Sequence, residues 1–459
     1  MPVLAVFLAA CASDVAAPPP RVAPTIGATA VVANTHNALS VTVSVRVRDA
    51  DSAGVRFHLD GASEAGSVTP AVQTAGDSAV IPVLGLLPAR RYTLSAVAYG
   101  GGGSVVGDAV QFTTDTLPSD LPRYSASGTD PSPGYVVFSA GAYALAIDNT
   151  GRVVWYRRFP NGAGLAFMAE PSGRYVVRPP TPDLGDVEPW LELDPLGNVT
   201  RAMACARGLQ PRLHDVIGEP DGSYWLMCDE TRTMDLSATG GRVSAVVTGT
   251  AVQHVSAAGT LLFHWSPFDH FEITDLNAAD RSGPSVNWTH GNAIELDTDR
   301  NLIVSFRNLG EITKIHSGTG AVLWRMGGRR NQFTFLDSPS PAFARQHGVR
   351  VSAPGTLILM DNVGNPNESR AERYIVDEVA RTARLAHSYG SVPGALTLIG
   401  GSVQSLPGGR TLVSFGTAGR VEEYNAAGQV LWRINGEPGY VFRAQRILSL
   451  YAPGLGTAR

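Results

Sequence analysis

Three histidines occupy nearly equivalent places ahead of an apolar strand pattern. His214 and His347 each lie 10 residues before the first apolar residue of a second strand, and His290 lies 12 residues before it. The corresponding place before Leu412 holds Ser402 instead. A repeated residue with a purely structural role is expected in every copy of a repeat, whereas this histidine occurs in three copies. The pattern therefore predicts one functional site to which all three histidines contribute.

Two further polar residues accompany His290. Asn292 shares a strand face with His290 because side chains alternate along a strand, and Arg307 ends the second strand that follows. A guanidinium group beside imidazoles suits an anion, since its planar fork matches sulfate, phosphate or carboxylate oxygens. A neutral imidazole is also a nucleophile toward phosphoryl or sulfuryl centres. Arg307 and a protonated histidine would stabilise the negative charge of such a transition state. These residue types predict transfer or hydrolysis of an anionic oxo-ester group without a metal.

Two alternatives stay open at this point. Three histidines could hold zinc in a metal-dependent hydrolase, with Asp215 beside His214 as a supporting carboxylate, although Arg307 would repel the cation. The chain could instead be a non-catalytic, surface-anchored propeller that binds glycan or protein. Net charge is −4 and no Lys/Arg cluster stands out, so we expect no nucleic-acid partner.

The elements that position these residues repeat along the chain. An Asp/Ser/Asn-x-x-Gly turn followed by a short apolar strand occurs six times, roughly 45 to 60 residues apart. In the fifth copy we align Ala380 with the turn glycine. Repeats of about 40 to 50 residues with four short strands each are typical of β-propeller blades. The turns begin at Asp148, Asp194, Ser256, Ser317, Asp377 and Asn425.

A six-bladed β-propeller over residues 118–459 is therefore expected. The first strand of each blade would line a central channel, so the three histidines would gather at one mouth of it. The second strand runs back to the same mouth, where we expect Arg307, Asp229 and Asn362.

The remaining chain divides into shorter segments. The 459 residues suit two or three domains, and 50 Gly and 31 Pro favour a mostly-β protein. Residues 24–117 alternate apolar and polar positions with a period of two, as in a β-sandwich. The stretch LLPARRYTLSAVAYG, followed by VQFTTDTLP, resembles the last strands of a fibronectin type III domain, with Tyr92 at the tyrosine-corner position. The expected fold class is all-β: a fibronectin type III-like sandwich followed by the propeller.

The cysteines carry information about location. Residues 1–11 resemble a bacterial lipoprotein signal ending at Cys11, the expected site of lipidation, although a cationic start is missing. Residues 12–23 form a Pro-rich linker. We expect an exported protein on the periplasmic side of the envelope, at the outer membrane, attached to the membrane through the lipid anchor alone because the apolar stretch is too short to span a bilayer. In an oxidising compartment Cys205 and Cys228 form a disulfide or remain two buried thiols.

The segments WTHGNAIELDTDRNLIVSFRN, FARQHGVR and LMDN resemble the bacterial arylsulfotransferases, which work without phosphoadenosine phosphosulfate. The resemblance implies a six-bladed propeller that moves sulfate from an aryl sulfate donor to a phenol acceptor by a ping-pong route, with no cofactor. It implies that His347 becomes sulfated and that His290 and Asn292 contact the sulfuryl oxygens. Arg307 would bind the sulfate, and His214 would bind sulfate or act as general acid/base.

The residues of this chain do not specify its oligomeric state, the side chains that hold the aryl ring, or whether the family activity is retained. The best-known members of this family form dimers, so a homodimer is one expectation. The aromatic groups that hold the aryl ring cannot be matched, because Trp288 and Phe306, the nearest in sequence, are also suited to a core. A family member that keeps the fold and has lost activity is a further alternative.

Overall fold

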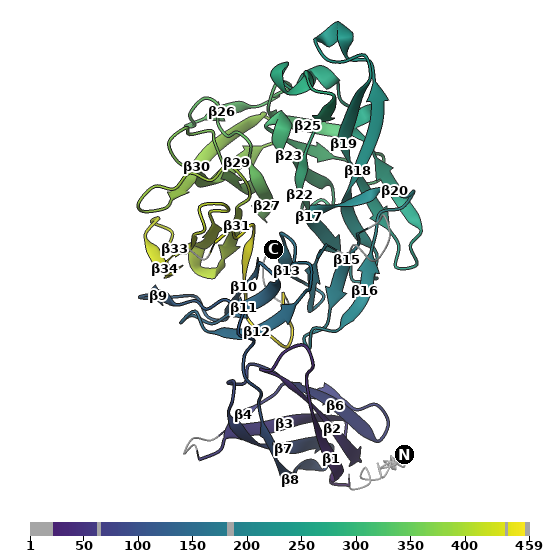
Figure 1. Ribbon diagram of the computed structural model, residues 1–459, viewed down its shortest axis with the longest axis vertical. Coiled ribbons are helices and arrows are strands. Elements are labelled where there is room, and N and C mark those ends of the chain that lie inside the picture. Colours follow the sequence, from purple (N-terminus) through teal and green to yellow (C-terminus); the bar gives the residue numbers. More distant parts are fainter. Residues whose placement is uncertain (1–21, 62–65, 181–187, 437–438, 455–459) are drawn as a thin grey trace, which may run out of the picture. The chain divides into compact units, whose positions relative to one another are not determined.

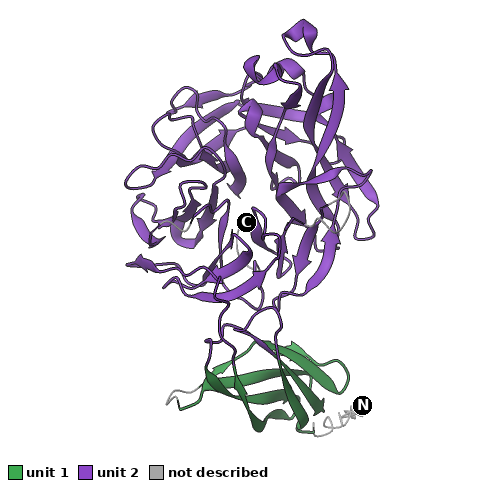
Figure 2. Cartoon of the chain, in the orientation of Figure 1, with its two compact units in different colours: residues 1–32, 42–83, 90–113 green, residues 33–41, 84–89, 114–459 purple. Residues whose placement is uncertain are grey.

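The computed structural model describes residues 22–61, 66–180, 188–436 and 439–454. The signal segment with Cys11 and nearly all of the 12–23 linker lie outside these residues. The chain divides into two compact units, residues 1–32, 42–83 and 90–113 in unit 1 and the remainder in unit 2 (Figure 2). Within the described residues, no helix is long and apolar enough to cross a membrane.

Unit 1 consists of two antiparallel sheets. Alternation along the strands decides which face is buried: Val41, Val43, Val45 and Val47 are all buried, and the residues between them are not. One sheet has the order β1-β2-β6, with β1 at Thr25–Ala33, β2 at Val41–Arg48 and β6 at Ser78–Val83. The other joins β4 (Ser67–Val68), β3 (Ser52–Leu59), β7 (Arg91–Gly100) and β8 (Gly103–Thr113), and β5 (Val72–Gln73) pairs with β3.

Unit 2 contains six sheets in the described residues, arranged around a common centre (Figure 1). Each has four antiparallel strands in chain order, apart from extra edge strands and one exception described below. The first sheet consists of β35 (Ala444–Ile447), β10 (Tyr135–Ala140), β11 (Tyr143–Ile147) and β12 (Val153–Arg158). The second consists of β13 (Phe167–Glu170), β14 (Arg174–Val177), β15 (Trp190–Leu193) and β16 (Val199–Met203). The third consists of β17 (Gln210–Gly218), β18 (Tyr224–Met234), β19 (Ala245–Val255) and β20 (Leu261–Trp265), with β21 (Ser285–Asn287) beside β19.

The other three sheets follow the same order. The fourth sheet consists of β22 (Gly291–Leu296), β23 (Leu302–Phe306), β24 (Glu311–Ile315) and β25 (Val322–Gly327). The fifth consists of β27 (His347–Ala353), β28 (Thr356–Asp361), β29 (Arg370–Asp377) and β30 (Thr382–Gly390), with β26 (Thr334–Leu336) beside β30. The sixth consists of β31 (Ser402–Leu406), β32 (Arg410–Ser414), β33 (Val421–Tyr424) and β34 (Val430–Ile434), with β9 (Ala126–Gly128) beside β34.

Helical structure in the described residues is limited to six short 3₁₀ turns, at Ser237–Thr239, Pro267–Asp269, Ile273–Asp275, Ala279–Arg281, Arg307–Leu309 and Pro407–Gly409.

The exception to chain order closes the ring. β35, from the end of the chain, supplies the first strand of the sheet that contains β10, while β9 adds to the last sheet. The first strands of neighbouring sheets contact one another, and Glu170 Oε2 accepts a hydrogen bond from Gly218 N at 3.2 Å between β13 and β17. The first strands therefore surround the centre.

The repeated turn lies between the third and fourth strands of every sheet. Its glycine has a positive φ, for example 88° at Gly151 and 79° at Gly428, where a side chain would be strained. The alignment of Ala380 with this glycine is corrected by the structure. There the left-handed residue is Arg381, with φ 53°, because the turn is one residue longer.

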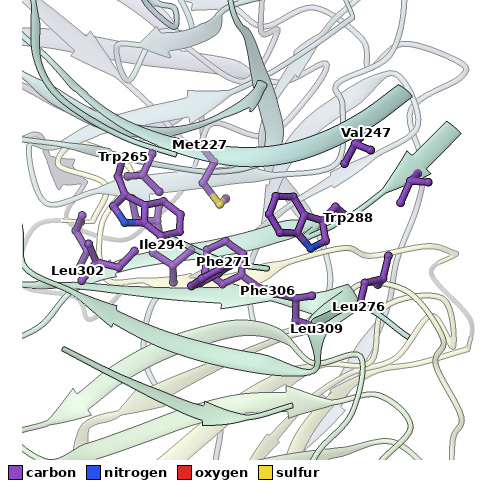
Figure 3. Close-up of a cluster of buried hydrophobic side chains, with 14 of the residues drawn as sticks. Met227, Val247, Trp265, Phe271, Leu276, Trp288, Ile294, Leu302, Phe306 and Leu309 are labelled. Atoms are coloured by element: carbon purple, nitrogen blue, oxygen red, sulfur yellow. The ribbon is translucent and has the colours of Figure 1, made fainter. Parts of the chain in front are cut away.

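The core lies between the sheets. A large apolar cluster fills the space between the sheet of β17–β20 and the sheet of β22–β25, and includes Trp265, Trp288 and Phe306 (Figure 3). Trp288 and Phe306 are thus core residues, two positions before His290 and one position before Arg307 in the chain.

Candidate active site

The strands that contain His214 and His347, and the strand that begins just after His290, are irregular beside these histidines. The pairing register shifts between Pro211 and Val216 in β17, at Gly291 in β22 and after His347 in β27. The first and second strands of the other three sheets pair without such a shift over their described residues. β-Bulges re-aim side chains and are common next to active sites. The histidine-bearing strands therefore depart from the regular sheet at the point where their histidines enter the centre.

The histidines come together at one end of the ring. The ring centroids of His214 and His290 are 5.2 Å apart. His214 and His347 both contact the ring of Phe442, at 5.5 and 6.1 Å between centroids. Phe442 lies two residues before the start of β35, so the segment that leads into this strand contributes a residue that packs against two of the histidines.

Hydrogen bonds determine which nitrogen of His347 carries its proton. The amide nitrogen of Asn362 donates to the carbonyl oxygens of Thr397 and Gly400, at 2.9 Å each. The Asn362 oxygen must therefore face His347 Nδ1, 2.7 Å away, and Nδ1 must carry the hydrogen. Nε2 keeps its lone pair, which accepts only a long bond of 3.3 Å from Gly400 N. His347 thus presents an unprotonated Nε2 at the site.

Asn292 and Arg307 lie beside these histidines. The Asn292 amide nitrogen donates to the carbonyl oxygen of Gln346 at 2.7 Å, next to His347 in the chain. The Arg307 backbone N–H donates to His290 O at 3.0 Å, and its Nη2 donates to Leu398 O at 3.3 Å, two residues before the Gly400 that contacts His347. All five site residues expected from the sequence are therefore brought together in unit 2.

The electrostatics keep the imidazoles neutral. Burial, together with Arg307 and other cations, lowers the pKa of His347 to about 4. Burial and then the charges of Arg212 and Arg307 lower the pKa of His290 to about 2. Burial and Arg212 also hold the pKa of His214 well below its ordinary value, and its Nδ1 has no hydrogen-bond partner among the described residues.

A buried ion cluster lies behind the histidines. The Asp215 carboxylate, fully buried, binds Arg350 at 2.9 Å and Arg443 at 2.8 Å and accepts a bond from Ile294 N at 3.1 Å. These contacts join β17, β22 and β27 to Arg443, the residue before β35. Asp215 thus fixes the strands directly beside His214, its neighbour in the chain.

Several residues of the site were not expected from the sequence. Arg212 donates to Gly291 O at 3.0 Å and pairs with Asp229, and Arg345 and Asn308 lie next to Arg307. These residues lie at strand ends or in connections where no repeat pattern marks them. One local signal exists, because Arg345 is two residues before His347 in the segment FARQHGVR.

A cavity of ≈ 700 Å³ opens beside the site. Tyr124, Tyr143, Tyr440 and Phe442 are among its lining residues. Phe442 is shared between this cavity and the histidines, so the two are adjacent.

Cys205 and Cys228 are joined by a disulfide, with their Cα atoms 6.2 Å apart. Over the ranges that the structure describes, no group of three or more His, Cys, Asp or Glu side chains has a geometry suited to a metal ion.

The fold and the site define an all-β protein with buried histidines beside arginine side chains at the centre of six sheets. Residues 210–437 match the family model described as Arylsulfotransferase (ASST), and the chain belongs to this family. The matched range contains His214, His290 and His347. The match supports an aryl sulfotransferase activity, and hence an enzyme.

Other comparisons add little. No curated protein matches this chain in sequence. A protein of unknown function from Bacteroides caccae has a TM-score of 0.45 and 11% identity over 68% of this chain and 98% of its own. A streptogramin B lyase has a TM-score of 0.39 and 13% identity over 68% and 84%. Regucalcin from Agrobacterium tumefaciens, a calcium-binding protein, has a TM-score of 0.36 and 17% identity over 70% and 95%. We draw no functional conclusion from these solved structures.

Proposed function

We propose that this protein transfers a sulfuryl group from an aryl sulfate ester to a phenol by a ping-pong mechanism, with His347 as the transiently sulfated residue and without a metal or cofactor. The observation that carries the proposal is the hydrogen bond between Asn362 Oδ1 and His347 Nδ1. It leaves Nε2 as a nucleophile beside the Arg307 guanidinium, the geometry that attack on an anionic sulfate ester requires.

In the first half-reaction, Nε2 of His347 forms a bond to sulfur while the bond from sulfur to the phenolic oxygen breaks. The electron pair of that bond leaves with the phenolate. The sulfated imidazole keeps its Nδ1 proton, which Asn362 Oδ1 accepts in a hydrogen bond, so the positive charge that develops on the ring is stabilised. Arg307 and the N–H group of His290 would contact the sulfuryl oxygens.

In the second half-reaction, the acceptor phenol attacks sulfur and the bond from sulfur to Nε2 breaks. His214, neutral in the ligand-free site, takes the proton of the acceptor hydroxyl. The same proton can then be donated to the phenolate that leaves in the next cycle. The cavity lined by Tyr124, Tyr143 and Tyr440 offers space for the aryl ring next to Phe442.

The test is turnover of p-nitrophenyl sulfate with and without phenol. We expect nitrophenolate release that depends on phenol, persists in EDTA and falls by about 10³-fold or more in His347→Ala, because the nucleophile is lost. In the absence of acceptor, the peptide that contains His347 should gain the mass of one SO₃ group.

His387→Ala is the matched control, because His387 lies on the fourth strand β30 and packs against Tyr389 away from the site. It should retain activity. Ligand binding without turnover would favour a non-catalytic propeller, and inhibition by EDTA would favour a metal-dependent hydrolase. Either result would reject the proposal.

We also propose a finer description of the fold. The six sheets of unit 2 are the blades of one propeller, and the two sheets of unit 1 form a fibronectin type III-like sandwich. The supporting feature is that the repeated turn precedes the fourth strand in each of the six sheets.

A further inference from the structure

Asn308 lies between two arginine side chains at the site. Its amide oxygen accepts hydrogen bonds from Arg307 Nη1 at 2.9 Å and from Arg345 Nη1 at 3.0 Å. Its amide nitrogen donates to the carbonyl oxygen of Asn287 at 2.6 Å, which determines the orientation of the amide. The two guanidinium groups therefore converge on one neutral oxygen.

The positive charge of this arginine pair is poorly balanced. Among the described residues, Arg307 makes no ion pair. Arg345 pairs with Asp280 at 3.3 Å, but the two side chains are 35% and 38% exposed, so the pair contributes little. The neighbouring histidines are neutral and supply no negative charge. Burial and then the charge of Arg345 lower the pKa of Arg307, and the charge of Asp280 offsets this only in part.

The backbone holds Arg345 in place at a cost. Arg345 has φ 53° and His290 has φ 49°, the left-handed region that residues other than glycine rarely adopt. The preceding residue is fixed on both sides, because Ala344 N donates to Asp361 Oδ1 at 2.9 Å and Ala344 O accepts from Val363 N at 3.1 Å. Such strain is concentrated at ligand-binding sites, where surrounding contacts maintain it.

We propose that Arg345 is a second sulfate-binding residue beside Arg307, and that Asn308 is the positioning residue that holds both guanidinium groups. The inference rests on the proposed function for the location of the sulfate. The ligand is a sulfate ester whose oxygens receive N–H donors from both arginines. The bound anion would supply the negative charge that the pair lacks, and its binding would remove the repulsion between the two cations.

The experiment measures binding of inorganic sulfate by calorimetry at constant ionic strength, because binding does not require turnover. We expect Arg345→Gln to weaken sulfate binding about tenfold, the usual effect of losing a hydrogen bond to a charged group. Arg345→Lys should restore part of the loss. Arg384→Gln is the matched control, because Arg384 forms an exposed pair with Asp337 on β30, and it should bind sulfate as the unchanged protein does.

Asn308→Asp tests the positioning role. The carboxylate keeps the shape of the amide and places a negative charge against both arginines, so sulfate binding should be weaker than in Asn308→Ala. If Asn308 had only a structural role, Asn308→Asp would reduce sulfate binding less than Asn308→Ala does. Thermal unfolding shows whether each variant is folded. If Arg345→Gln does not fold, the sulfate affinities of Arg345→Lys and Asn308→Asp test the inference instead.

The inference is overturned if Arg345→Gln binds sulfate as tightly as the unchanged protein, or if the unchanged protein binds no sulfate. Failure of the proposed function has a different signature. In that case p-nitrophenyl sulfate is not turned over, while sulfate binding still depends on Arg345.

Discussion

At the scale of single residues, His347 depends on Asn362 for its reactive form. Two backbone carbonyls fix the amide of Asn362, and the amide in turn fixes the tautomer of the imidazole. A carboxylate at position 362 would face those two carbonyls without donors to offer them. An amide is therefore required both by the histidine and by its own surroundings.

The lowered pKa of His347 predicts activity well into the acid range. Burial reduces this pKa to about 4, so the nucleophile becomes protonated only below that pH and is neutral above it. We expect the acid limb of kcat/KM for p-nitrophenyl sulfate to have its midpoint near pH 4, with full activity at about pH 5.5. Initial rates measured in a stopped assay, with folding monitored at each pH, test this.

A midpoint near the ordinary histidine value of about 6.5 would contradict the prediction. The variant Asn362→Ala offers a comparison. The hydrogen bond from His347 to Asn362 raises the pKa of His347, so its loss in the variant should shift the acid limb to lower pH. The value of kcat should also fall, because the tautomer of His347 is no longer selected.

At the scale of elements, β29 contains an acid that is protonated in the folded protein. The hydroxyl of Tyr374 lies 2.6 Å from Glu372 Oε2 and 2.9 Å from Ala342 O. A hydroxyl has one hydrogen and can donate to only one acceptor. When Glu372 is protonated, its carboxyl group can donate to the Tyr374 oxygen while Tyr374 donates to Ala342 O, so both contacts are satisfied. The pKa of Glu372, which burial and then Asp361 raise to about 8, favours this protonated form at neutral pH.

Glu372→Gln is predicted to stabilise the protein above about pH 5. The pKa of Glu372 is higher in the folded chain than in the unfolded chain, so its contribution to stability is present below the unfolded value and is lost as pH rises toward 8. The glutamine keeps a donor to Tyr374 without this loss. The gain in free energy of unfolding should grow to a few kcal/mol by about pH 8 and then level off, as denaturant titrations at several pH values would reveal.

Glu422 in β33 is the matched control. It stands two residues before Tyr424, as Glu372 stands before Tyr374, but the guanidinium of Arg433 lies 3.5 Å away. Glu422→Gln removes an ion-pair partner and should destabilise the protein. Equal effects of the two substitutions at every pH would contradict our account.

The elements were predicted from sequence far better than the contacts between them. The repeated turn identified the third and fourth strands, and the shared offset identified His214, His290 and His347. The bulges beside these histidines leave no periodic signal in the sequence. Phe442 is distant in sequence from the histidines it contacts, and Asn308 acts through a turn, so neither could be found from a pattern.

At the scale of the whole molecule, the ring of unit 2 is closed by its last strand. β35 pairs with β10 and brings Ile447 and Ala444 into two apolar clusters. We predict that removal of residues 444–459 abolishes the cooperative unfolding transition of unit 2, because the edge of β10 and its buried side chains become exposed. Calorimetry would detect the loss.

Removal of residues 455–459 alone is the control for that truncation. It leaves every described strand intact and should preserve the transition. A chain that ends at residue 443 and still unfolds cooperatively at an unchanged temperature would show that closure by β35 is dispensable.

The closing strand also has a consequence for synthesis. Phe442 and Arg443 directly precede β35, so a chain growing on the ribosome already contains all three histidines long before it contains the residues that pack against them. The full surroundings of His214 and His347 can therefore form only after β35 has been synthesised and has paired with β10.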